Sequence, residues 1–283
     1  MSNQQLGFTL RIFIPNGDPE GLRIIEKSNW TGQGLVFPRS TYKHVHYRPE
    51  LNSTGVYILW GPGETKQLPE IYIGEGDGVV DRLNSHVKIK DFWTQAIVFV
   101  SKDQSLNKAH VQHLEARMVS LAKDAKLCVL KNDVIPLLPQ LSEADASDAE
   151  SFLADILLCL PIMGLNIFET SFTTSNKGYN LFLKGKGIEA QGTFDTKYFI
   201  IRAGSTAVKP KDLFVTELGG ILDDLRRTLV ENGVLLDIGD KYQFQQDYPF
   251  DTPNKAATII LGVPSNGYNE WKDNKGIPLK IIL

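Results

Sequence analysis

The sequence predicts an α+β protein in which a small mixed β-sheet flanked by helices is followed by a separate, small α+β domain. The chain has 283 residues, more than one small domain usually contains. In its first half, short runs of β-type residues alternate with helical apolar stripes. From about residue 180 the pattern changes to short strands separated by turn residues. These observations predict two folded parts joined by a connector.

Residues 1–49 are predicted to form an N-terminal β appendage. Residues 8–14 alternate apolar and polar side chains, which favours a strand. A cluster of turn-forming residues at 15–19 separates them from a second short element at 22–26. The run from about residue 30 to residue 50 has no clear period, so we expect it to be mostly loop.

Residues 50–139 are predicted to form the central α+β unit. Its clearest helix carries Val111, Leu114 and Met118 in one apolar stripe at helical spacing. Its first two strands are joined by a long loop and are predicted to pair as a hairpin. The expected elements are strands at 55–60, 71–74 and 96–100, and helices at 79–88 and 108–125.

The remaining residues are predicted to form an acidic connector and a second domain. Residues 140–180 hold one Lys against six Asp or Glu, and a helix at 147–160 is expected to bridge the two halves. Residues 181–283 form the predicted C-terminal α+β domain. Its expected strands are 181–183, 188–193, 198–203 and 242–246, and its expected helices are 218–231 and 253–261.

Composition and charge limit the function classes. The net charge of −3 argues against a strongly basic nucleic-acid-binding protein, although residues 1–49 hold six Lys or Arg against three Asp or Glu. Neither a signal peptide nor a long uninterrupted apolar run is evident, so we expect a cytoplasmic protein with no membrane association. Cys128 and Cys159 lie in apolar surroundings and are predicted to be reduced core thiols.

Five polar residues of the central unit form a candidate site. Tyr57 and Tyr72 lie on the two strands of the predicted hairpin, each close to a glycine. Arg82 and His86 are four residues apart on the next helix and therefore share one of its faces. Glu115 lies beside the apolar stripe of the long helix rather than opposite it. Taken singly, each residue is more often a packed tyrosine or a surface charge, and only their combination favours a function.

Hydrolysis of a phosphodiester bond needs this inventory. A base must remove a proton from water, a cation must neutralise the phosphate, and a carboxylate usually holds a hard metal ion. One glutamate completed by water and phosphate oxygens suits Mg²⁺ better than Zn²⁺.

The motifs around these residues resemble those of the GIY-YIG endonuclease family. Gly55-Val56-Tyr57 and Tyr72-Ile73-Gly74 are similar to the two tripeptides that name the family. The remaining motif positions follow in the family's order at Arg82 with His86, Glu115 within His113-Leu114-Glu115-Ala116-Arg117, and Asn132.

The resemblance implies an endonuclease that uses Mg²⁺ or Mn²⁺ to hydrolyse DNA, with double-stranded DNA as its partner, in defence, restriction or mobile-element biology. By position, Tyr57 would be the general base with His86 assisting it, and Arg82 would hold the scissile phosphate. Glu115 would bind the metal ion. The resemblance further implies that Tyr72 and Asn132 position the phosphate or brace the site, and the division of roles between the two tyrosines stays a hypothesis.

The flanking regions also resemble parts of bacterial proteins that contain such nucleases. The stretches 11–14, 21–23 and 29–32 are similar to a leader that precedes the nuclease domain. The stretches 192–205, 252–257, 265–267 and 270–272 are similar to an uncharacterised module fused behind it. Relatives of that module are associated with restriction and DNA modification, which suggests nucleic-acid contact.

One departure from the family keeps two alternatives open. Several family members carry a lysine after the second motif, whereas this chain has Glu75-Gly76-Asp77. A cation is lost there and two acids are added, so a nucleic-acid-binding protein that cleaves weakly or not at all is the second hypothesis. An interaction module without any nucleic-acid role is the third. Salt-sensitive DNA binding without cleavage would favour the second hypothesis.

Four other residues have plainer interpretations. His110 and His113 have no third metal ligand nearby at zinc spacing, so we expect them to be surface or boundary histidines. Trp30 and Trp271 are predicted to be packing anchors, with base stacking by Trp271 as the alternative.

Overall fold

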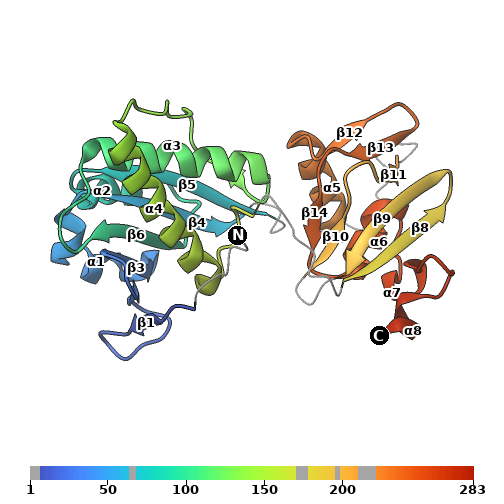
Figure 1. The fold of residues 1–283 in the computed structure, drawn as a ribbon, viewed down its shortest axis with the longest axis horizontal. Helices are drawn as coiled ribbons and strands as arrows, with labels where there is room; N and C mark the ends of the chain where they lie inside the picture. Colours follow the sequence, from blue (N-terminus) through green and yellow to red (C-terminus); the bar gives the residue numbers. More distant parts are fainter. Residues whose placement is uncertain (1–6, 64–67, 170–177, 195–197, 210–220) are drawn as a thin grey trace. The chain divides into compact units, whose positions relative to one another are not determined.

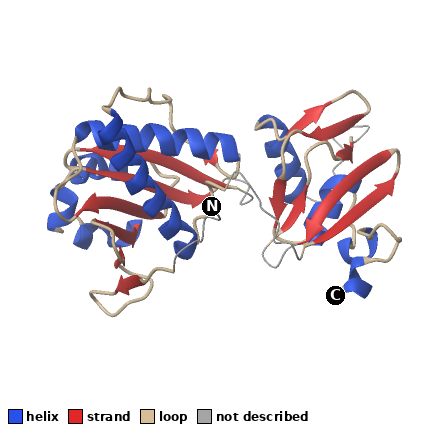
Figure 2. Cartoon of the chain, viewed as in Figure 1, coloured by secondary structure: helices blue, strands red, loops and turns tan. Residues whose placement is uncertain are grey.

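The computed structural model describes residues 7–63, 68–169, 178–194, 198–209 and 221–283. The fold is α+β, as predicted, with several β-sheets and helices (Figures 1 and 2). The chain divides into two compact units, Met1–Glu169 (unit 1) and Thr170–Leu283 (unit 2). Among the described residues, no helix has both the length and the apolar character that a membrane crossing requires.

Unit 1 is built on a seven-stranded sheet with the order β1-β2-β3-β6-β4-β5-β7. Neighbouring strands are antiparallel except for β5 and β7, which are parallel. The predicted hairpin is confirmed, because β4 pairs with β5 along its whole length. The strands are β1 (Leu10–Phe13), β2 (Arg23–Lys27), β3 (Gly32–Pro38), β4 (Gly55–Pro62), β5 (Pro69–Gly76), β6 (Gln95–Ser101) and β7 (Val129–Leu130).

Helices cover both faces of this sheet. The longest is α3, which carries an asparagine cap at Asn107 and ends at Lys126 in the left-handed conformation. The helices of unit 1 are η1 (Arg39–Thr41), α1 (Tyr42–Val45), η2 (Pro49–Asn52), α2 (Val79–Ile89), α3 (Lys108–Ala125), α4 (Glu143–Cys159) and η3 (Leu160–Met163).

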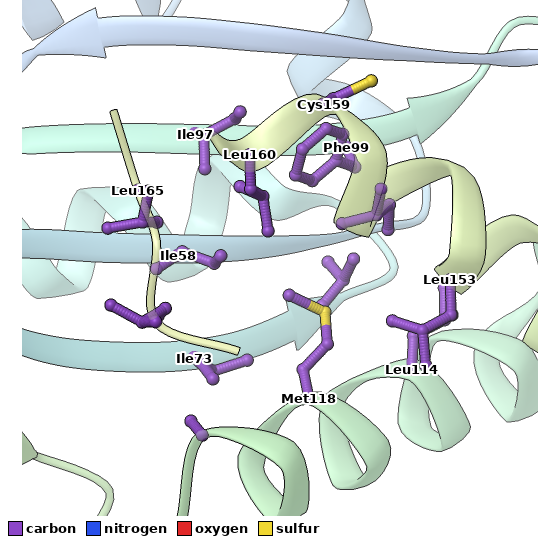
Figure 3. Packing of buried hydrophobic residues seen from close by; sticks show 14 of the residues in the cluster. Ile58, Ile73, Ile97, Phe99, Leu114, Met118, Leu153, Cys159, Leu160 and Leu165 are labelled. Carbon is purple, nitrogen blue, oxygen red and sulfur yellow. The ribbon is translucent and has the colours of Figure 1, made fainter. Parts of the chain in front are cut away.

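Alternation along the strands gives each face its own core. On β6, Ile97 and Phe99 point to the face that α3 and α4 cover, whereas Val98 and its even-numbered neighbours point to the face of α1 and α2. Figure 3 shows Leu114 and Met118 of α3 and Leu153 of α4 on the first face, over the strand residues Ile58, Ile73 and Ile97. The two cores fix α2 and α3 against opposite faces of β5.

Two expectations for residues 1–49 are wrong. The stretch expected to be loop contains β3, which lies between β2 and β6 inside the sheet. Gly32 and Gly34 hide the strand signal, and they are glycines because aromatic rings occupy the space of their side chains; a Cβ at residue 34 would lie 2.9 Å from Cε1 of Phe99. Strands β1 to β3 therefore extend the central sheet instead of forming an appendage.

The acidic helix α4 also differs from its expected role as a bridge between halves. It packs within unit 1, where the Phe152 and Trp30 rings are 5.0 Å apart between centroids. Its Asp155 forms an ion pair with Lys27 of β2, with 2.9 Å between the carboxylate oxygen and Nζ. The structure thus joins the predicted appendage, central unit and most of the connector into one unit.

Unit 2 contains a four-stranded sheet in the order β14-β10-β9-β8 and a three-stranded sheet in the order β11-β13-β12, all antiparallel. Residues 218–220 of the predicted helix lie outside the described residues. The elements are β8 (Tyr179–Gly185), β9 (Ile188–Phe194), β10 (Phe199–Ile201), β11 (Thr206–Val208), α5 (Ile221–Glu231), β12 (Leu235–Asp237), β13 (Lys241–Phe244), β14 (Tyr248–Phe250), α6 (Pro253–Leu261), α7 (Gly267–Glu270) and α8 (Leu279–Ile282).

Candidate active site

The hairpin places Tyr57 and Tyr72 on the face of the sheet that α2 covers. Tyr57 belongs to the core cluster on that face, and Tyr72 packs against it. Gly74 is the direct partner of Tyr57 across the hairpin. A Cβ at residue 74 would overlap the hydroxyl oxygen of Tyr57, so only glycine leaves room for this side chain. The packing of Tyr57 therefore explains why the Tyr72-Ile73-Gly74 motif ends in glycine.

His86 of α2 completes a cluster of three rings. Its Nε2 lies 2.7 Å from the Tyr57 hydroxyl oxygen, a buried hydrogen bond in which the donor depends on the histidine tautomer. The ring centroids of Tyr72 and His86 are 4.8 Å apart, and those of Tyr57 and Tyr72 are 6.3 Å apart. Tyr57 is 1% exposed, whereas Tyr72 is partly exposed. Tyr72 is thus the tyrosine that faces solvent.

Burial controls ionisation within the cluster. It lowers the pKa of His86 to about 4, with help from the positive charges of Lys90 and Arg82, so the ring is neutral at pH 7. Burial likewise raises the pKa of Tyr57. The pKa of Tyr72 is raised by burial and then by Glu115, against the lowering effects of Arg82 and of a hydrogen bond with Tyr57.

Arg82 lies one turn before His86 on α2. Its side chain passes over the strand end at Gly76, where a Cβ would lie 3.2 Å from Arg82 Cγ. Arg82 is exposed, and within the described residues it makes no hydrogen bond or ion pair through its guanidinium. Its charge nevertheless lowers the pKa values of Tyr57, Tyr72 and Glu115. The guanidinium is therefore an uncommitted cation beside the tyrosines.

Glu115 comes from α3, which packs on the opposite face of the sheet. Its carboxyl group is half-buried, and burial together with the charge of Glu75 raises its pKa to about 7, against the effects of Arg82 and Lys108. No hydrogen bond or ion pair joins it to another described residue. A half-buried carboxyl group without a partner either stays neutral or binds a cation, and a bound cation would stabilise its charged form.

Asn132 closes part of the outer edge of β5. Its Oδ1 accepts from the Ile73 N–H at 3.1 Å, and its Nδ2 donates to the Ile73 carbonyl at 2.7 Å. The side-chain amide thus replaces the partner that a neighbouring strand would supply, just beyond the two-residue strand β7. This geometry fits a bracing role for Asn132.

These residues meet at one end of β5. Tyr57, Tyr72, Arg82 and His86 lie on the α2 side of the strand, and Glu115 lies on the α3 side. The charge of Arg82 acts on each of the other four residues, and Asn132 braces β5, the strand that separates Glu115 from them.

One residue near this site was missed by sequence reasoning. Lys108, the first residue of α3, donates to both carboxylate oxygens of Glu75 at 2.8 and 2.7 Å. The available signal was its spacing, because Lys108 precedes Glu115 by seven residues and so shares its helix face.

The donor set fits Mg²⁺ or Mn²⁺ better than a metal held by the protein alone. Within the described part of the chain, no three or more His, Cys, Asp and Glu side chains are grouped to hold a metal ion. Mg²⁺ commonly binds one or two carboxylates and takes its other ligands from water and phosphate. The unpartnered Glu115 carboxyl suits such an ion.

The two histidines of α3, His110 and His113, have structural roles. His113 Nε2 lies 2.7 Å from Glu150 of α4, which also accepts from Arg117 at 2.6 Å. His110 belongs to the capping box at Asn107. Both histidines are thus engaged at the boundary between helices, and His113 is buried rather than at the surface.

Comparison with known protein families matches residues 181–282 to a domain of unknown function (DUF4357). This match lies within unit 2. No curated protein and no solved structure matches the chain. A function for unit 1 has therefore to follow from the geometry of its own residues.

The motif residues of unit 2 hold that domain together. Asn254 accepts from the Gly267 N–H at 2.7 Å, and Trp271 Nε1 donates to the Pro253 carbonyl at 3.2 Å. Trp271 is fully buried, and its ring centroid is 4.6 Å from that of Phe199. Trp271 is therefore a packing anchor, as predicted, and it presents no face for base stacking.

Proposed function

We propose that unit 1 is a metal-dependent endonuclease that hydrolyses phosphodiester bonds in DNA. The observation that supports this proposal is the meeting, at one strand end, of a hydrogen-bonded Tyr57–His86 pair, an uncommitted arginine and an unpartnered, half-buried glutamate. These groups match the proton acceptor, the phosphate cation and the metal ligand that the reaction needs.

The proton acceptor works through the ring cluster. Tyr72 faces solvent, so it is the tyrosine that an attacking water can reach directly. A proton can pass from Tyr72 through the Tyr57 hydroxyl to His86, because that hydroxyl lies 2.7 Å from His86 Nε2 and the two tyrosine rings are 6.3 Å apart between centroids. His86 is neutral and can accept that proton on Nε2. This assignment makes Tyr57 a relay within the base, a modification of the role that the family resemblance implies for it.

Arg82 and Glu115 act on the phosphate from the two faces of β5. The Arg82 guanidinium would bind the phosphate and stabilise its developing negative charge. Glu115 would hold Mg²⁺ or Mn²⁺. When bound, such an ion polarises the phosphate and acidifies a coordinated water.

A DNA-binding protein that does not cleave is the second candidate. It is favoured by the acidic Glu75 beside the site and by the near-neutral net charge of −3. The ion pair with Lys108 weakens this argument, because it neutralises Glu75.

Cleavage of supercoiled plasmid with Mg²⁺ or Mn²⁺ tests the proposal. We expect nicking or linearisation by the wild type, its loss in Glu115→Ala and Tyr57→Phe, and its retention in the control Glu20→Ala, which changes an exposed carboxylate elsewhere. We also expect the metal ion to raise the melting temperature of the wild type but not of Glu115→Ala.

The outcomes separate the candidates. DNA binding that weakens with salt, without cleavage of plain, modified or branched DNA, would favour the second candidate. Absence of DNA binding at low salt would contradict both.

A further inference from the structure

The ion pair between Lys108 and Glu75 is unlike an ordinary surface pair. The Glu75 side chain is 9% exposed and the Lys108 side chain 42%. In the surface pair Lys184–Glu189, by contrast, both partners are at least 66% exposed. A buried carboxylate that binds through both oxygens fixes the position of a partly exposed ammonium group.

The position of this ammonium group relates it to the candidate site. Glu75 directly follows the Gly74 that accommodates Tyr57, and it lies on the α3 face of the sheet with Ile71 and Ile73. Lys108 and Glu115 lie two turns apart on one face of α3. The charges of both Lys108 and Glu75 act on Glu115.

The ammonium group has spare binding capacity. It has three N–H donors, of which Glu75 takes two. Lys108 makes no other ion pair with a described residue. Because the ammonium group is partly exposed, its third N–H can bind an anion that approaches the end of β5.

Charge balance favours a phosphate as that anion. Arg82 and Lys108 offset Glu75 and Glu115, so these four groups sum to zero in their ionised forms. A divalent cation at Glu115 would make the strand end positive by two charges and attract the DNA backbone.

We propose that Lys108 is a further phosphate-binding residue of this site, held in place by Glu75, and that it binds a DNA phosphate next to the one on Arg82. The proposal rests on the proposed endonuclease function. It also gives Glu75 a role: β5 carries no lysine after its motif, and the Glu75 carboxylate holds the Lys108 ammonium group at that position instead.

The test measures DNA binding against salt concentration, with Ca²⁺ in place of Mg²⁺ so that cleavage does not interfere. One lost phosphate contact lowers the slope of log Kd against log salt by about 0.9, which corresponds to about eightfold weaker binding at 0.1 M salt. We expect this change in Lys108→Met and its reversal in Lys108→Arg. The control is Lys102→Met, because the Lys102 side chain is 40% exposed and is also paired with a strand glutamate, Glu26 at 3.4 Å.

The results distinguish this proposal from the one on which it rests. A wild-type salt slope in Lys108→Met would overturn the role of Lys108, while plasmid cleavage by the wild type would leave the endonuclease in place. No DNA binding by the wild type would overturn both. If Lys108→Met fails to fold with Glu75 unpaired, the double variant Lys108→Met/Glu75→Gln removes the buried charge, and the same loss of slope is expected from it.

Discussion

Gly74→Ala is the substitution that best tests the geometry of the hairpin. The new Cβ would overlap the hydroxyl oxygen and Cζ of Tyr57 and would lie 3.0 Å from its Cε2. Tyr57 is 1% exposed, and its ring is enclosed by the core between β4 and α2. The ring must therefore shift, and the shift breaks its 2.7 Å hydrogen bond with His86.

The cost of Gly74→Ala follows from these contacts. Overpacking a core typically costs about 1–3 kcal/mol, and leaving a buried hydrogen-bonding group unpaired costs about 1–3 kcal/mol more. Replacing glycine returns about 0.4–1 kcal/mol by restricting the unfolded chain. We expect a net loss of roughly 2–4 kcal/mol, since neither penalty is realised in full when the ring relaxes. For a domain of this size that lowers the melting temperature by about 4–16 °C.

A double-mutant cycle with Tyr57→Phe shows whether the hydroxyl causes this loss. Phenylalanine lacks the overlapped oxygen, so Gly74→Ala should cost about 1–2 kcal/mol less in the Tyr57→Phe background. Urea unfolding of the four proteins measures the coupling energy. Additive effects within about 0.5 kcal/mol, or a Gly74→Ala variant as stable as the wild type, would refute the proposed close approach of Gly74 and Tyr57.

Two further predictions concern residues beside the hairpin. The pKa of His86 is about 4 in the folded protein and 6.5 in the unfolded chain, so between these values the unfolded chain binds one proton more than the folded protein. Acidification from pH 6.5 to 4 should therefore lower the free energy of unfolding by up to about 3 kcal/mol. Urea unfolding in a Glu115→Gln background measures this, since the raised pKa of Glu115 acts in the opposite direction, and an equal pH dependence after His86→Gln would contradict it. Asn132→Leu should cost about 1–2 kcal/mol and accelerate amide exchange at Ile73, whose N–H loses its acceptor; unchanged exchange at Ile73 would show that Asn132 does not brace the strand.

The elements with strong local signals could be predicted from the sequence. Helix α3 runs from Lys108 to Ala125, the bounds that its apolar stripe and flanking residues predict, and α6 runs from Pro253 to Leu261 as expected. In both cases a side-chain cap marks the first turn, at Asn107 and at Thr252. Signals of this kind are contained within a few neighbouring residues.

The features that depend on distant residues could not be predicted. Strand β3 lacks a sequence signal at Gly32 and Gly34, because the rings of Trp30 and Phe99 fill the space that side chains at these two positions would take. The burial of Tyr57 beneath Tyr72 and His86 is likewise a tertiary property, and it changes the proposed proton path. Sequence order alone cannot show which of two tyrosines faces solvent.

The acidic Glu75 shows the same limit for charge. By sequence it removes a cation from the end of β5 and weakens the case for a nuclease. In the folded chain α3 brings Lys108 to its carboxylate, 33 residues away in sequence, so the local charge is neutralised. A charge in a motif therefore has to be weighed together with the residue that the fold places against it.

The motifs of unit 2 lead to a related conclusion about where its function lies. The residues that carry its resemblance to other proteins bind one another: Asn254 accepts from Gly267, Trp271 donates to Pro253, and the Thr252 side chain caps α6. Their side chains are used in joining α6 to α7 and in filling the core beneath β10. A shared pattern of this kind specifies a common fold and does not identify a common ligand. If unit 2 contacts nucleic acid, exposed side chains outside this pattern have to make the contact.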